Sequence, residues 1–72
     1  MATLDARGLK CPLPVLKARR ALKELPPGEA LEVLATDPAA PKDFQAFARE
    51  AGLTVETLEA PAGEYRLALR RA

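Results

Sequence analysis

The spacing of apolar residues along the chain predicts two helices and four strands. Apolar residues recur at helical spacing from Val15 to Leu25, and again in a segment that starts near Asp37 and ends before Gly52. Pro26-Pro27-Gly28 ends the first helix, and Asp37 is the predicted N-cap of the second. Apolar and polar residues alternate, as is typical of strands, over residues 2–6, 29–36, 53–59 and 64–70.

The order βαβαββ predicts an α+β fold, a two-layer sandwich of one sheet and two helices in a single domain over residues 1–72. Right-handed strand-helix-strand connections place both helices on one face of a four-stranded mixed sheet. The short segment 60–63 predicts an antiparallel hairpin for the last two strands, and the polar alternation of 64–70 predicts that the other face of the sheet meets solvent. Phe44 and Phe47 share a helix face and are expected in the core.

The amino-acid composition excludes several kinds of active site. Cys11 is the sole cysteine and the chain has no histidine, so an internal disulfide, a Ser-His or Cys-His nucleophile pair and the common zinc sites are excluded. We expect no metal and no other cofactor. No segment has the roughly 20 apolar residues of a membrane span and the first residues do not resemble a signal peptide, so we expect a cytoplasmic protein that does not bind membranes.

Cys11 lies where the chain changes from loop to helix. Pro12 and Pro14 follow it, and since a proline disfavours helical geometry in the preceding residue, Cys11 and Leu13 are expected to be extended or turn-like. The helix N-terminus, Lys10 and Arg7 are then the groups expected to acidify the thiol mildly, with Asp5 orienting Arg7. The alternative is that Cys11 is a small buried apolar residue without chemistry.

Three motifs together resemble the TusA/SirA-like sulfur-carrier family: Leu4-Asp5-Ala6-Arg7-Gly8-Leu9-Lys10-Cys11-Pro12-Leu13-Pro14-Val15, then Pro27-Gly28-Glu29, then Thr36-Asp37-Pro38. The resemblance covers nearly the whole chain. It implies a fold similar to the C-terminal domain of translation initiation factor 3, and a persulfide carried on the cysteine of the Cys-Pro-x-Pro motif. Such a protein is a carrier in a sulfur relay rather than a self-sufficient enzyme.

Carried over to this chain, the resemblance makes Cys11 the sulfur-bearing residue. Asp5, Gly8, Pro12 and Pro14 then have positioning roles. The basic residues near the motif are implied to dock partners or to stabilise the thiolate: Arg7, Lys10, Lys17, Arg19 and Arg20. Some members have a second cysteine on the second helix, where this chain has Ala48, so sulfur must leave by attack from another molecule.

The implied partners are a cysteine desulfurase or rhodanese-like donor and a downstream acceptor protein, with the carrier itself monomeric. The pathway stays open between transfer-RNA thiolation, molybdenum-cofactor sulfuration, sulfur oxidation and selenium-related roles.

Two other functions remain possible from the residues. A module that binds RNA or a regulatory protein would use the basic first third of the chain, but aromatic residues for base stacking are not interleaved with the cations, so direct nucleic-acid binding is not favoured. A redox-sensing thiol would react with peroxide faster than with a sulfur donor.

Overall fold

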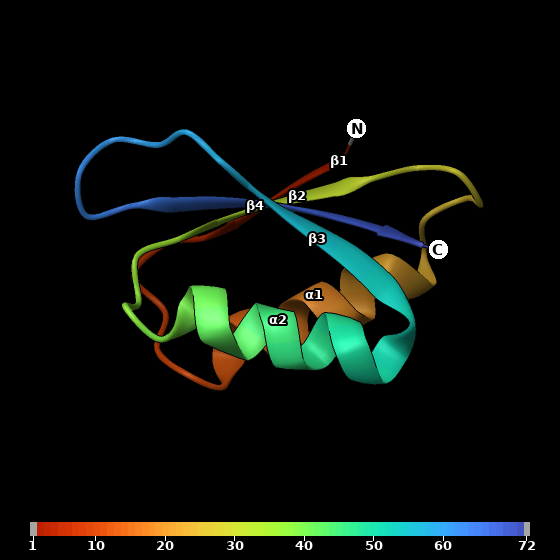
Figure 1. Ribbon diagram of the computed structural model, residues 1–72, viewed down its shortest axis with the longest axis horizontal. Helices are drawn as coiled ribbons and strands as arrows, with labels where there is room; N and C mark the ends of the chain where they lie inside the picture. Colours follow the sequence, from red (N-terminus) through yellow and green to blue (C-terminus); the bar gives the residue numbers. More distant parts are fainter. Residues whose placement is uncertain (1, 72) are drawn as a thin grey trace.

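The computed structural model describes residues 2–71 as one sheet covered on one face by two helices (Figure 1). Along the chain the elements are β1 (Ala2–Ala6), α1 (Leu13–Lys23), β2 (Leu31–Ala35), α2 (Ala40–Ala51), β3 (Leu53–Leu58) and β4 (Tyr65–Arg71). The strand order is β1-β2-β4-β3. Strands β1 and β2 are parallel, and β4 is antiparallel to both of its neighbours. The predicted order and the two-layer mixed architecture are confirmed.

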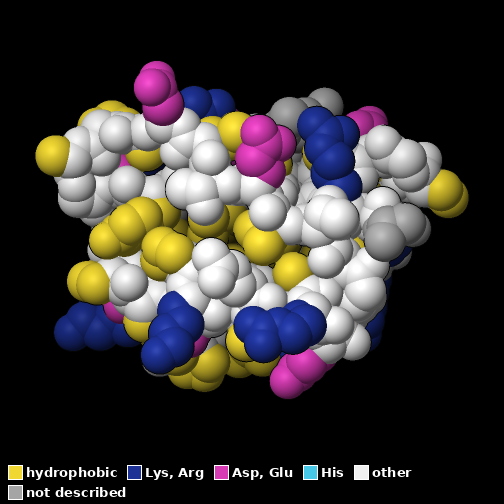
Figure 2. Space-filling view, viewed as in Figure 1, with side chains coloured by type: hydrophobic (Ala, Val, Ile, Leu, Met, Phe, Trp, Pro, Cys, Tyr) yellow, Lys and Arg dark blue, Asp and Glu magenta, His cyan; other side chains and the backbone are white. Residues whose placement is uncertain are grey.

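The core lies between the sheet and the helices and is aliphatic apart from two phenylalanines. Phe44 of α2 is fully buried and meets Phe47 edge-on, with ring centroids 6.5 Å apart, so the predicted core role of this pair is confirmed. Figure 2 shows apolar side chains gathered between the two layers on the side where β3 and α2 face the viewer. The other core residues are Ala6, Ala18, Leu22, Leu31, Val33, Ala35, Ala40, Leu67 and Leu69.

Both helices begin at positions other than the predicted ones. Helix α1 starts at Leu13, two residues before Val15, although Leu13 precedes Pro14. The N–H of Leu13 donates to the Lys10 carbonyl (2.9 Å), and Pro14 at the second helical position lacks a donor that would have had no partner there. The expectation that Leu13 is non-helical was therefore wrong, whereas Cys11 does lie in a turn.

Asp37 is not the N-cap of α2. The cap is Ala39, without a side-chain hydrogen bond, and the helix begins at Ala40. The carboxylate of Asp37 accepts from the N–H of Ala39 at 3.2 Å and also contacts the Cys11 loop. At the other end, Gly52 has φ 72°, the left-handed conformation expected of a residue that ends a helix.

The β3–β4 hairpin is confirmed as antiparallel, but its connection spans residues 59–64 rather than 60–63. Strand β4 extends to Arg71, whose guanidinium donates to the Leu22 carbonyl at 2.7 Å and so joins the end of the sheet to the end of α1. Ala2 and Arg71 lie at the same end of the sheet, because Ala2 pairs with Leu31 and Leu31 pairs with Leu69, two residues before Arg71. The loops after β1 and β2 lie at the opposite end.

Candidate functional site

The loop that carries Cys11 is fastened to the loop after β2. The N–H of Cys11 donates to the Asp37 carboxylate (Oδ2) at 2.7 Å, and the N–H of Gly8 donates to the Thr36 hydroxyl at 2.9 Å. Gly8 has φ 82°, a conformation that favours glycine, so its predicted place in a turn is confirmed. Two neighbouring loops at one sheet edge therefore fix the backbone on both sides of the Leu9-Lys10 segment.

Pro12 and Pro14 lie at the start of α1, as the motif predicted. Pro12 is the N-cap residue, and its carbonyl accepts from the N–H of Leu16 at 3.1 Å, which closes the first helical turn. The peptide bond between Cys11 and Pro12 is cis. The side chain of Cys11 is exposed just before the helix, so the alternative of a buried, inert cysteine is not supported.

The electrostatics of the thiol differ from the expectation. The pKa of Cys11 is raised above its ordinary value, first by a hydrogen bond with the Asp43 carboxylate, then by partial burial, and then by the negative charges of Asp43 and Asp37. Negative groups next to a thiol disfavour the thiolate. The predicted mild acidification was therefore wrong, because the carboxylates of Asp43 on α2 and of Asp37 in the loop after β2 both disfavour the thiolate.

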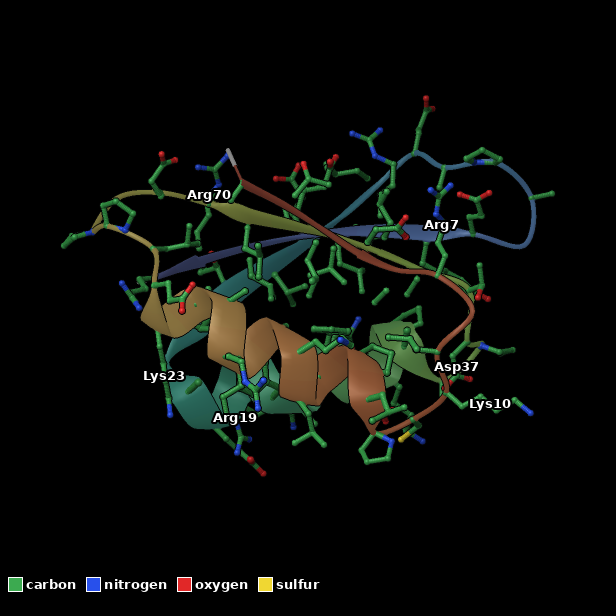
Figure 3. All side chains as sticks on the ribbon, turned by 180° about the vertical axis from the view of Figure 1, so that it is seen from behind. Arg7, Lys10, Arg19, Lys23, Asp37 and Arg70 are labelled. Atoms are coloured by element: carbon green, nitrogen blue, oxygen red, sulfur yellow. The ribbon has the colours of Figure 1, made fainter. Side chains whose placement is uncertain are left out.

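Arg7 does not stabilise the thiolate either. Its guanidinium forms a two-pronged ion pair with Asp5 (Nε to Oδ1 and Nη2 to Oδ2, both 2.9 Å) and lies 3.7 Å from Glu64. This pairing lowers the pKa of Asp5 to about 2 and raises that of Arg7. The expectation that Asp5 orients Arg7 is confirmed. Figure 3 shows Arg7 beside the sheet, whereas Lys10 and Asp37 lie together nearer the helix layer.

The exposed side of α1 combines apolar and basic residues next to the thiol. Leu13 and Leu16 are 45% and 49% exposed, and neighbouring exposed apolar side chains can mark an interaction site. They lie one turn apart, and Lys17 and Arg20 follow at helical spacing. We call Leu13, Leu16, Lys17 and Arg20, together with the neighbouring Lys10, the docking face. Lys10, Lys17 and Arg20 are all exposed.

A groove between α1 and α2 leads away from Cys11. Its first part, a hollow of about 230 Å³, is lined by Cys11, Pro12, Val15, Arg19, Asp43, Ala46, Phe47 and Glu50. Arg19, Phe47 and Glu50 also line the next part, which continues to Lys23 and Arg71. The guanidinium of Arg19 lies 5.3 Å from the centre of the Phe47 ring, a cation–π contact. Arg19 therefore belongs to the groove rather than to the docking face.

Sequence reasoning gave no role at the thiol to three residues that shape the site, although the first two belong to one of the family motifs: Thr36, Asp37 and Asp43. A signal for the first two was present, because the ends of adjacent parallel strands meet at one sheet edge and bring the loops that follow them together. Asp43 gave no comparable signal, since an acidic residue in the first turn of a helix is ordinary. Within residues 2–71, no helix is long and apolar enough to cross a membrane.

Comparisons with known proteins identify relatives of this chain. The family described as Sulfurtransferase TusA matches residues 2–71. The sulfur carrier protein TusA of Allochromatium vinosum is 39% identical over 69 residues, 96% of this chain and 91% of that protein. A candidate sulfur carrier protein from Neisseria meningitidis is 58% identical over 50 residues, 69% of this chain and 68% of its own length.

A solved structure has the same fold. The crystal structure of a SirA-like protein from Desulfitobacterium hafniense superposes with a TM-score of 0.82 at 35% sequence identity, and the match covers 96% of this chain and 95% of that one. The profile match over nearly the whole chain, the similar carriers and the shared fold lead to one conclusion: this protein belongs to the TusA family of sulfur carriers.

Proposed function

We propose that this protein accepts a sulfur atom on Cys11 as a persulfide and relays it to an acceptor protein. The observation that carries the proposal is an exposed thiol whose own backbone N–H is held by Asp37 at 2.7 Å, directly before a helix start fixed by two prolines. A thiol presented in this way is reachable by a large donor and returns to the same position after each transfer.

Loading is a thiol exchange in which the sulfane sulfur changes carriers. The Cys11 thiolate attacks the terminal sulfur of a donor persulfide, a new sulfur–sulfur bond forms on Cys11, and the donor cysteine leaves as a thiolate. Release is the same step with an acceptor thiolate as the nucleophile. Because the sequence contains no second cysteine, both steps need another molecule. We infer that a cysteine desulfurase or a rhodanese-like enzyme is the donor.

We further propose that partners bind the docking face. Two exposed leucines surrounded by lysine and arginine fit a protein surface with an apolar centre and acidic surroundings. Arg7, which was predicted to belong to the docking set, is engaged with Asp5 and Glu64, so we assign it a structural role in the loop. The RNA-binding alternative gains no support, since Phe44 and Phe47 are buried and Tyr65 is half-buried.

The test is to incubate the protein with a cysteine desulfurase and cysteine, followed by intact-protein mass spectrometry without reductant. We expect the mass to increase by one sulfur atom, and the increase to disappear on treatment with a small thiol. The Cys11→Ser variant is the matched control and should not change in mass. The proposal is wrong if the wild-type protein gains no sulfur, or if Cys11→Ser gains as much.

A further inference from the structure

Asp43 on α2 faces the thiol from the other side of the groove. It lies in the first turn of the helix, is half-buried, and lines the same hollow as Cys11, Pro12 and Val15. Its carboxylate is the first cause of the raised pKa of the Cys11 thiol, through hydrogen bonding and then through its negative charge. A thiol needs no such partner to stay in place, because its loop is already held by Asp37 and Thr36. The presence of a carboxylate in the same hollow as the thiol therefore calls for a chemical explanation.

The charged groups around Cys11 are mostly acidic. Asp37 binds the Cys11 amide from the loop after β2, and Asp43 and Glu50 come from α2. The cations are Arg19 of α1, which is engaged with the Phe47 ring, and Lys10 of the same loop, which is exposed. Hydrogen bonding to Asp43, burial, and the charges of Asp43 and Asp37 raise the pKa of the thiol. A sulfur atom added to Cys11 enters the same environment.

A persulfide reacts in opposite ways in its two protonation states. The anion R–S–S⁻ is a nucleophile, whereas the neutral form R–S–SH accepts attack by a thiolate at its terminal sulfur. Persulfides are more acidic than thiols, so in water near neutral pH a large share is in the anionic form. A carrier that has to give sulfur away needs the neutral form. A neighbouring carboxylate favours it by repelling the anion and by accepting a hydrogen bond from the S–H group.

We propose that Asp43 is a positioning residue that holds the persulfide carried on Cys11 in its protonated form, with the terminal sulfur open to attack by an acceptor thiolate. The inference rests on the proposed function. The hollow of about 230 Å³ has room for the extra sulfur, given that one water molecule takes about 30 Å³ in the liquid.

The transfer step balances without an oxidant or a reductant. The acceptor thiolate attacks the terminal sulfur of Cys11–S–SH, and a new sulfur–sulfur bond forms. The old bond breaks, its electron pair stays on the Cys11 sulfur as a thiolate, and the proton of the terminal S–H leaves with the transferred sulfur. The Cys11 thiolate then takes a proton from water. Asp43 favours this protonation, so the empty carrier does not attack the product.

The same environment opposes loading, because loading needs the thiolate of Cys11. A donor enzyme that brings a base or a cation near Asp43 when it docks therefore loads Cys11 faster than a small persulfide does. The carrier would thus accept sulfur mainly from such a donor but deliver it to many kinds of thiol. Sulfur would therefore move from the donor enzyme through the carrier to the acceptor.

The test compares wild type with Asp43→Asn, and uses Glu50→Gln as the matched control because Glu50 lines the same hollow. Each protein is loaded chemically with glutathione persulfide, and the persulfide is titrated by the near-ultraviolet absorbance of its anion. We expect Asp43→Asn to lower the pKa of the persulfide and, in unloaded protein, of the thiol. Each unit of decrease raises the anion-to-neutral ratio about tenfold. Glu50→Gln should leave both titrations nearly unchanged.

Two reaction rates at pH 7 distinguish control of the persulfide's protonation from simple repulsion of an attacking thiolate by Asp43. Alkylation of the loaded protein by iodoacetamide, which uses the anion, should become several-fold faster in Asp43→Asn. Delivery of sulfur to dithiothreitol, which uses the neutral form, should become several-fold slower, since the better leaving group offsets only part of the loss. If Asp43→Asn speeds both reactions, or titrates like wild type, the assignment of Asp43 is wrong. If wild type takes up no sulfur on Cys11 from a cysteine desulfurase either, the proposed function itself is wrong.

Discussion

Removing the Asp37 side chain should loosen the loop that carries the thiol without unfolding the protein. The carboxylate accepts from the N–H of Cys11 at 2.7 Å and from that of Ala39 at 3.2 Å. A hydrogen bond to a charged group contributes roughly 1.5–3 kcal/mol, and partial exposure of Asp37 argues for the lower end, about 1.5 kcal/mol for the shorter bond. Asp37→Ala should then make local opening of the Cys11 loop about tenfold more frequent.

Amide hydrogen exchange measured by NMR reports this loop opening directly at the Cys11 amide. In Asp37→Ala the Cys11 amide should exchange about tenfold faster than in wild type. Asp37→Asn keeps an acceptor oxygen but loses the charge, so its exchange rate should lie between those of wild type and Asp37→Ala. Thr36→Val removes the partner of the Gly8 amide and should speed exchange at Gly8. The Val33 amide, in the buried centre of β2, reports any change in global stability.

The refuting result is specific. If the Cys11 amide in Asp37→Ala exchanges within twofold of wild type after correction for global stability, the hydrogen bond does not fasten the loop. If each variant speeds exchange at both Cys11 and Gly8, the two bonds hold the loop as one unit. We then expect desulfurase-dependent loading to fall in both variants, because the thiol spends less time in its presented position.

Three further predictions concern stability and docking. Phe44→Ala removes a fully buried ring and should lower the free energy of unfolding by about 3–5 kcal/mol in urea titrations, where a loss below about 1.5 kcal/mol would contradict the core assignment. The folded pKa of Asp5, about 2, lies below its ordinary value of 3.8, so the pair with Arg7 stabilises the folded protein above about pH 4 and is lost as the pH falls towards 2. The thermal midpoint of Asp5→Asn should therefore fall less steeply than that of wild type between about pH 4 and pH 2. An unchanged slope would argue against the ion pair. Leu16→Glu should raise the KM for desulfurase-dependent loading roughly tenfold while leaving chemical loading unchanged, and equal effects on both would argue against the docking face.

The fold was predictable because the sequence is locally consistent with it. Apolar spacing, proline stops and a glycine after α2 all indicate the same order of elements, and right-handed crossovers leave few alternatives. The error at the start of α1 depends on a local hydrogen bond from Leu13 to Lys10, whereas the error at the start of α2 depends on a bond between distant segments. Asp37 looked like an N-cap from its neighbours alone, but its carboxylate is shared with Cys11, 26 residues earlier.

The position of the thiol could be predicted from the sequence, but its acidity could not. Pro12 and Pro14 fix the helix start locally, so the placement of Cys11 follows from the motif. Its pKa depends on Asp43, which α2 brings across the groove, and no local pattern reports which side chain of one helix faces another. The adjacent residues Lys10 and Arg7 were the expected cations. Arg7 instead forms a two-pronged ion pair with the Asp5 carboxylate two residues earlier.

The placement of Ala2 and Arg71 at the end of the sheet opposite to the Cys11 loop has a consequence for fusion proteins. A donor or acceptor domain attached at either end starts on the far side of a molecule whose longest dimension is 31 Å. A flexible linker whose average reach grows as about 5–6 Å times the square root of its length needs roughly 30 residues to bring its cargo to Cys11. With a shorter linker the tethered domain does not reach Cys11, and only freely diffusing partners react with the thiol. With a longer linker the tethered domain competes with these partners for Cys11 at an effective concentration on the order of millimolar.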